Sequence, residues 1–262
     1  GKTVIRVNGT ITKPQELAAI DMRLYLAGAS MADLYPLTGI TLPKTPEFST
    51  EGHLIGVTDK RGGKWTYEKF KGKVGDSDIA GSLVYEAKQP RPLLSGTVVS
   101  NLLQLSDLGP VIGADSNESK KERGVAANQP ANKVLPVEKF TTERWGSIDA
   151  DVKITGHKIV HSASLPIENL DTHLKLEDSV VTLSPLKFGV AGGNLIGDIK
   201  LDGRNNVIKA QAKISARHLK LKQLFPTFQP MQASFGEVNG DTSLSGTGNS
   251  IASLLATSNG EI

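Results

Sequence analysis

Apolar and polar residues alternate along most of this chain, and residues 188–201 show the pattern, with Ile196 as an exception on the polar side. Residues two apart in a strand face the same way, so Leu195 and Ile199 share one side while Asn194 and Asp198 share the other. The pair Gly192-Gly193 provides the positive φ that a tight turn between two strands needs. This stretch predicts a hairpin with one apolar face and one polar face, and the same pattern recurs from end to end.

The alternation predicts a chain dominated by β-strands. The predicted strands cover residues 21–27, 48–57, 65–70, 78–87, 94–101, 148–155, 158–163, 170–176, 180–183, 207–216 and 237–245, and residues 2–13 form an edge-like strand or hairpin. Composition agrees, because glycine is abundant, at 27 residues, while aromatic residues make up only 5% of the chain. The large apolar residues are spread in alternation instead of in helical blocks.

Three short helices are predicted between the strands. Ser30 is a residue type that caps a helix N-terminus, and Pro36 should stop the helix that follows it. Residues 138–145 can form two helical turns. Residues 250–256 form a capped helix that Gly260 should end, because glycine commonly follows a helix C-terminus.

An internal repeat relates the two halves of the chain. At a constant offset of 116 residues, Gly81, Leu103, Leu105, Leu108 and Pro110 fall on Gly197, Leu219, Leu221, Leu224 and Pro226. Repeated units that cannot cover their own apolar faces tend to stack into elongated arrays. Residues 114–133 contain a single large aliphatic residue, Val125, which is too little to favour ordering. We predict a first β unit at 1–113, a flexible loop or linker at 114–133, and a related unit at 134–262 that continues the first.

About a dozen strands with one apolar face each need something to cover that face. Two packed sheets would cover each other, as in a β-sandwich. A single, strongly curved sheet would instead leave an apolar groove, and an apolar patch beyond a few hundred Å² usually meets a ligand, a partner or a membrane. Aliphatic walls with few aromatic residues suit acyl chains better than sugars, which stack on aromatic rings.

Several classes of function find no support in the residues. The net charge of +3 comes from 30 basic and 27 acidic residues and describes a mixed surface, so nucleic acid is not an expected partner. Cysteine is absent, and we interpret His157 and His161 as surface residues, because a zinc site needs three or four converging ligands. No apolar run of about 18 residues could span a membrane as a helix, and no G-x-S-x-G motif is present. We predict no cofactor, no metal and no enzymatic activity.

Three stretches of the chain resemble the AsmA family of bacterial envelope proteins: residues 135–156 (LPVEKFTTERWGSIDADVKITG), 165–204 (LPIENLDTHLKLEDSVVTLSPLKFGVAGGNLIGDIKLDGR) and 246–262 (GTGNSIASLLATSNGEI). The resemblance implies a large periplasmic protein whose β-groove carries phospholipids toward the outer membrane. It also implies an anchor in the inner membrane, which we expect outside this sequence. These are implications of the resemblance and add to the groove hypothesis above.

The leading hypothesis is a mainly β, elongated and strongly curved antiparallel sheet with a few short helices, whose apolar groove binds or conducts phospholipid without chemistry. The residues predicted to line the groove are Met22, Leu24, Leu26, Leu83, Val152, Ile154, Leu174, Leu176, Leu195, Ile199 and Ile214. A second hypothesis is an assembly module whose sheet edges pair with client strands during outer-membrane protein insertion. A third, a hydrolase with a site among the acids and histidines, stays open.

Overall fold

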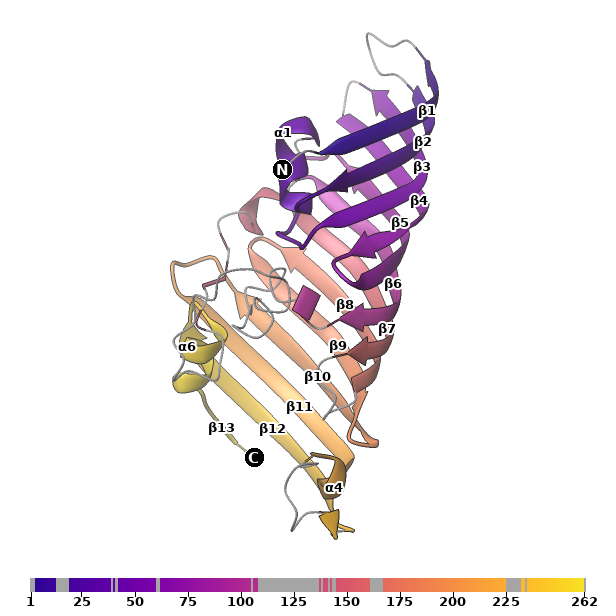
Figure 1. Cartoon of the computed structure of the whole chain (residues 1–262). Helices are drawn as coiled ribbons and strands as arrows, with labels where there is room; N and C mark the ends of the chain where they lie inside the picture. The colour runs from indigo at the N-terminus through magenta and orange to yellow at the C-terminus, as the bar shows by residue number, and fades with distance from the viewer. Residues whose placement is uncertain are drawn as a thin grey trace.

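The computed structural model describes residues 3–12, 19–38, 40, 42–59, 62–104, 106–107, 137, 139–140, 142, 145–160, 167–224, 232–233 and 235–261. It is mainly β, with 69% of these residues in strands, which confirms the predicted fold class. Thirteen strands form one open, curled sheet in which they follow one another in chain order (Figure 1). The described strands therefore make a single sheet, and the β-sandwich alternative is wrong.

The strands are β1 Val4–Thr12, β2 Ala19–Gly28, β3 Phe48–Asp59, β4 Gly62–Val74, β5 Ser77–Glu86, β6 Leu93–Gln104, β7 Asp149–Val160, β8 Ile167–Glu177, β9 Val180–Val190, β10 Gly193–Asp202, β11 Ile208–Lys220, β12 Glu237–Gly248 and β13 Asn259–Glu261. The helical elements are short: η1 Met31–Leu34, α1 Tyr35–Thr38, η2 Trp145–Ser147, α4 Leu221–Leu224 and α6 Ile251–Ala256. Several predicted strands prove longer than expected. Residues 149–155 and 158–160, which were predicted to belong to two strands, form one strand, β7. Residues 161–163 lie outside the described part of the chain, and residues 180–183 are only the start of β9.

All neighbouring strands pair antiparallel except β6 and β7, which run parallel with Gly96 opposite Val152. A parallel pair needs a long connection to bring the chain back to the same end of the sheet. Residues 105–148 make that connection, and the predicted loop at 114–133 lies within it but outside the described residues. The sheet is thus antiparallel, as predicted, with one parallel junction in its middle.

The spacing of the repeat reappears in the strands. β5 and β10 begin and end 116 residues apart, and the helical residues 106–107 correspond by the same offset to α4. Strand β4 has an irregularity between Tyr67 and Phe70, and β9 has one between Leu183 and Leu186, at the same offset. The division into a first and a second unit stays a prediction, since the sheet continues from β6 into β7 without a break.

Three predicted local features are wrong. Pro36 lies inside α1 and does not stop the helix, because a first-turn proline gives up only an N–H that has no helical partner. Lys139, Phe140 and Thr142 are not helical, and the nearest helical turn is η2. Gly260 lies in β13, opposite Leu244, and α6 ends earlier.

Other turn predictions are confirmed or refined. The Ser30 side chain accepts a hydrogen bond from the Ala32 N–H and caps η1, and Ser250 forms a capping box with Ser253 at the start of α6. The hairpin between β9 and β10 exists, but positive φ occurs at Ala191 (51°) and Gly192 (70°) instead of at the two glycines. This agrees with the two-residue turns that suit twisted hairpins.

The buried cores lie along the two long edges of the sheet where strands turn. We call the edge where β2, β4, β9 and β11 end the first rim, and the edge where β8 and β10 end the second rim. Two clusters lie at the first rim, Leu34, Phe48 and Val74 near α1, and Val190, Ala191 and Leu219 near α4; a third, Phe140, Ile208 and Leu254, lies at the second rim under α6. The short helices thus cover strand ends and leave the middle of the sheet to other contacts.

Candidate functional site

One face of the sheet carries an uninterrupted row of apolar residues. The row follows the pairing of Cα atoms from one edge strand to the other: Gly9, Met22, Leu54, Tyr67, Leu83, Gly96, Val152, Leu174, Leu183, Ile199, Ala212, Leu244 and Gly260. It contains no charged side chain, and its one hydroxyl group belongs to Tyr67. With a strand spacing of about 4.8 Å, twelve steps extend over about 58 Å. We call this side of the sheet the apolar face.

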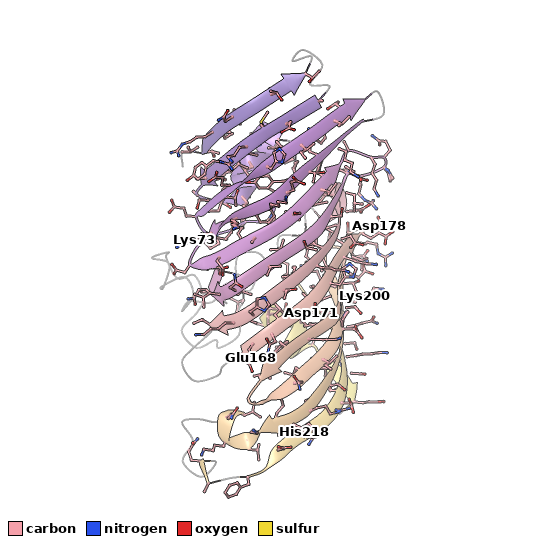
Figure 2. All side chains as sticks on the ribbon, turned by 90° about the vertical axis from the view of Figure 1, so that its right-hand side faces the viewer. Lys73, Glu168, Asp171, Asp178, Lys200 and His218 are labelled. Carbon is pink, nitrogen blue, oxygen red and sulfur yellow. The ribbon has the colours of Figure 1, made fainter. Side chains whose placement is uncertain are left out.

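The row one residue further along the strands faces the other way and is mostly polar. It consists of Thr10, Asp21, Ile55, Thr66, Val84, Ser95, Asp151, Lys175, Thr182, Lys200, Gln211, Ser245 and Asn259. We call this side the polar face. The sheet curls around the side on which α1 and α6 lie (Figure 1), and Figure 2 looks at the polar face, where Lys73, Glu168 and Lys200 point outward.

The pairing register places all eleven predicted lining residues on the apolar face. Five of them, Met22, Leu83, Val152, Leu174 and Ile199, belong to the row itself. The other six lie on neighbouring positions of the same face: Leu24 opposite Gly52, Leu26 opposite Thr50, Ile154 opposite Thr172, Leu176 opposite Val181, Leu195 opposite Ala216 and Ile214 opposite Thr242. Contact between these residues and lipid stays a prediction.

The exposure of these residues describes an open face. Met22 and Val152 are buried, each with 8% of its surface exposed, whereas the other nine are only half-buried. A closed sandwich would bury such aliphatic side chains from both sides. Half-buried aliphatic or aromatic side chains lie on this face on every strand from β2 to β12. Together they form the kind of apolar patch that usually has an occupant.

Aromatic side chains on β4 and β5 form part of the apolar face that the sequence interpretation missed. The Trp65 ring lies against Gly56, which is opposite it on β3, and against Gly63, two residues earlier on β4. A Cβ atom on Gly56 would come within 2.5 Å of the ring, and one on Gly63 within 2.1 Å. The Trp65 and Tyr85 ring centroids are 5.8 Å apart. Glycine therefore makes room for flat rings, a pairing that stabilises sheets. The signal in the sequence is a glycine on β3, Gly56, that pairs with an aromatic residue on β4, Trp65.

Tyr67 and Phe70 extend this aromatic surface toward the first rim. Their rings stack with centroids 5.3 Å apart. The Tyr67 hydroxyl donates to the Leu24 carbonyl over 3.3 Å and lies 3.2 Å from Thr50 Oγ1, so the phenol lies along the sheet across β3. Burial raises the pKa of Tyr67 above its ordinary value, and the group stays neutral in the physiological range.

Two hydroxyl groups of the described residues are buried without a hydrogen-bond partner, those of Thr58 on β3 and Thr172 on β8, and Thr172 lies in the middle of the apolar face. Thr172 on β8 is only 5% exposed, and its Oγ1 is fully buried and unpaired in the described structure. It lies opposite Ile154 on one side and Leu186 on the other, next to an irregularity in the pairing of β8 with β9. A buried hydroxyl without a partner costs free energy, so this position is a local weakness of the sheet.

The polar face is held by ion pairs across strands. His53 on β3 bridges two carboxylates, with Nε2 2.7 Å from Asp21 Oδ1 and Nδ1 3.0 Å from Glu68 Oε1, and these hydrogen bonds raise the pKa of His53. His173 Nε2 lies 2.6 Å from Asp151 Oδ1, and this hydrogen bond lowers the pKa of Asp151. Both histidines thus bind carboxylates of neighbouring strands.

The described residues show neither a metal-binding cluster nor a membrane-spanning helix. They contain no group of three or more histidines or acidic residues that could hold a metal ion. None of their helices is long and apolar enough to cross a membrane.

Comparison with known proteins adds a family to this geometry. A model of the AsmA family matches residues 1–262. The chain belongs to the AsmA family. It is similar to the AsmA family protein YhjG of Escherichia coli (strain K12), with 45% identity over 270 aligned residues that cover 100% of this chain and 39% of that protein. The chain thus spans about 39% of the length of this relative, and no solved structure matches it.

Family membership gives this chain a role related to the bacterial cell envelope. AsmA family proteins are not known as enzymes, and the absence of enzymatic activity in this chain stays a prediction.

Proposed function

We propose that this chain is a non-enzymatic segment of a periplasmic protein that binds the acyl chains of phospholipids on its apolar face and conducts them between the inner and outer membranes. An anchor in the inner membrane would lie outside this sequence. The observation that carries the proposal is the apolar row, which crosses all thirteen strands without a charge and stays half-exposed at positions such as Leu174 and Ile199.

The energetic reason is the cost of moving an acyl chain through water. Each methylene exposed to water costs about 0.8 kcal/mol, so a chain of roughly 16 carbons costs on the order of 12 kcal/mol. An apolar face that covers one side of the acyl chain at every strand removes much of this cost. Since neighbouring positions along the row are similar in chemistry, no position holds the chain strongly enough to stop it. Conduction of the lipid therefore needs a continuous apolar row and no covalent step.

Photo-crosslinking in cells that make the full-length protein tests this proposal. A photoreactive amino acid at Ile199 would lie on the apolar face, and one at Lys200, the next residue of β10, on the polar face (Figure 2). We expect phospholipid adducts at Ile199 and none at Lys200. Equal adducts at both positions, or crosslinks from Ile199 only to other parts of the protein, would mean that the apolar face does not carry lipid.

The edge strand β1 favours a second candidate function, an assembly module that pairs with client strands. Its apolar side chains Ile5, Val7 and Ile11 are exposed at 47%, 59% and 43%, whereas the residues opposite them on β2, Leu26, Leu24 and Ile20, are half-buried. Among the described strands, β1 pairs on one side only, and an edge with such side chains can accept another strand. A photoreactive residue at Val7 would then crosslink to outer-membrane proteins that have not yet folded. If it captures none of them while Ile199 captures lipid, the conducting function is the better account.

A further inference from the structure

Trp65 and Tyr85 lie together on the apolar face, close to the second rim. They are directly opposite each other on β4 and β5, and the row through them continues with Gly56 on β3 and Leu94 on β6. β5 ends, and β6 and β7 begin, at the second rim. Tyr85 is one residue from the end of β5, and Trp65 is three residues from the start of β4. We call Trp65 and Tyr85 the aromatic pair.

Each ring of the aromatic pair has a hydrogen-bond donor that the described part of the protein does not use. The Trp65 Nε1 and Tyr85 Oη atoms have no hydrogen-bond partner among the described residues, whereas the Tyr67 hydroxyl donates to a carbonyl of β2. The described buried polar atoms without a partner are the hydroxyl oxygens of Thr58 and Thr172, so the two donors of the aromatic pair are not sealed from solvent. Burial raises the pKa of Tyr85, so its phenol keeps the proton at neutral pH.

The aromatic pair lies on an open part of the apolar face. Trp65, Tyr85 and their neighbour Leu94 are half-buried, and they belong to none of the three described hydrophobic clusters. The cluster near α1 lies at the other end of β5, where Ile79 packs against it (Figure 1). Ile79 is six residues from Tyr85, or about 20 Å along the strand. At β10, by contrast, the second rim is covered, because Leu201 packs against the cluster under α6.

The charged side chains described at these strand ends lie off the apolar face. Lys64 and Glu86 are opposite each other on the polar face, with Nζ 2.9 Å from Oε1. Lys88 is exposed in the connection between β5 and β6, and Arg91 in the same connection pairs with Asp149. The donors that the apolar face itself offers at this end are therefore uncharged, and they match acceptors that carry no charge.

Aromatic residues with a polar tip suit the border between acyl chains and water. The body of a Trp or Tyr ring packs on apolar groups while its N–H or O–H reaches a polar one, as at membrane interfaces. In a diacyl phospholipid the first polar atoms beyond the acyl chains are the two ester carbonyl oxygens, which are uncharged acceptors. The ring centroids of the aromatic pair are 5.8 Å apart, so one lipid can contact both rings.

We propose that the aromatic pair binds the ester groups of a phospholipid, with the Trp65 N–H and the Tyr85 O–H donating to ester carbonyl oxygens. The acyl chains continue onto the apolar row at Leu83 and Gly96, which lie two residues further from the second rim. The headgroup projects beyond the rim into solvent, and because neither donor is charged, the contact does not depend on the headgroup. This inference rests on the proposed function.

The test uses the purified full-length protein with a photoreactive amino acid at Leu94, directly opposite Tyr85. The protein is incubated with vesicles that contain equal amounts of a diacyl phospholipid with a choline headgroup and of its diether analogue. The analogue has the same headgroup and chain lengths but no carbonyl oxygens. Mass spectrometry measures the ratio of the two lipids among the adducts. We expect the ester lipid to be preferred about fivefold for each hydrogen bond that it accepts.

Tyr85→Phe removes one oxygen atom and should lower the preference about fivefold, and the addition of Trp65→Phe should bring the ratio close to one. Tyr67→Phe is the matched control, because the Tyr67 hydroxyl already donates to the Leu24 carbonyl, and this variant should keep the preference.

A second probe, at Leu174 on the apolar row, reports whether lipid binds elsewhere on the apolar face. Equal capture of the two lipids, a preference that the double variant retains, or adducts at Leu174 with none at Leu94 would overturn the ester inference and leave the conducting function standing. Absence of adducts of either lipid at both Leu94 and Leu174 would instead overturn the proposed function itself.

Discussion

A carboxylate placed on the apolar row should interrupt lipid binding at that point. Ile199 lies between Leu183 and Ala212 on the neighbouring strands and is half-buried, so Ile199→Asp fits without a steric clash and keeps access to water. An acyl chain that passes this position covers one strand spacing with roughly four methylenes. If the hydrated carboxylate keeps these in water, the loss is about 3 kcal/mol, or on the order of 100-fold in local occupancy.

The assay is the yield of phospholipid adducts from a photoreactive residue at Leu183, on the adjacent strand. In the full-length protein this yield should fall at least about tenfold with Ile199→Asp, a conservative bound on the occupancy change. Lys200→Asp, the same new carboxylate on the polar face, should leave it unchanged. An unchanged yield in Ile199→Asp, with normal protein levels and an unaltered melting temperature, would refute the claim that acyl chains follow this row.

Three further predictions concern stability and use unfolding of the full-length protein. Thr172→Val should raise the stability by about 1 to 2 kcal/mol, because it removes a buried hydroxyl without a partner; a loss of stability would mean that the hydroxyl has a partner. Asp107→Ala should cost about 3 kcal/mol and Asp107→Asn less, because the buried carboxylate accepts three hydrogen bonds from the turn before β5; equal costs would contradict this. Hydrogen bonds to Asp21, and then to Glu68, raise the pKa of His53 in the folded protein. The protonated His53 therefore contributes its full stabilisation below the unfolded-state pKa of 6.5, and this stabilisation is lost as the pH rises through the higher folded-state pKa. His53→Gln should flatten the melting temperature over that range, and an unchanged pH profile would exclude His53 as its cause.

The faces of the strands were predictable from the sequence because they depend on a period of two residues. Leu195 and Ile199 share a face in the structure for the geometric reason that placed them together in the sequence. The caps at Ser30 and Ser250 were predictable for a similar reason, since a hydroxyl next to free N–H groups acts locally. The repeat offset of 116 residues reappears in the bounds of β5 and β10, because equal patterns bury equal faces.

Features that depend on distant contacts were not predictable. Tyr67 and Phe70 are three residues apart and still share the apolar face, because an irregularity in β4 shifts the alternation between them. No local pattern indicates where such a shift occurs. The parallel pairing of β6 with β7 depends on the path of a long connection. Arg91 forms ion pairs with Asp149 and with Asp178, which is 87 residues away, so only the folded sheet brings these residues together.

The most direct test of the central claim is a photo-crosslinking scan along the apolar row in the full-length protein. Three probes, at Leu54 on β3, Leu174 on β8 and Leu244 on β12, sample both ends and the middle of the row, and His53, Lys175 and Ser245 are their neighbours on the polar face. A conducting face predicts phospholipid adducts at all three apolar positions and at none of the three controls. Adducts at the ends but not at Leu174, or equal adducts on the polar face, would contradict a continuous path for lipid.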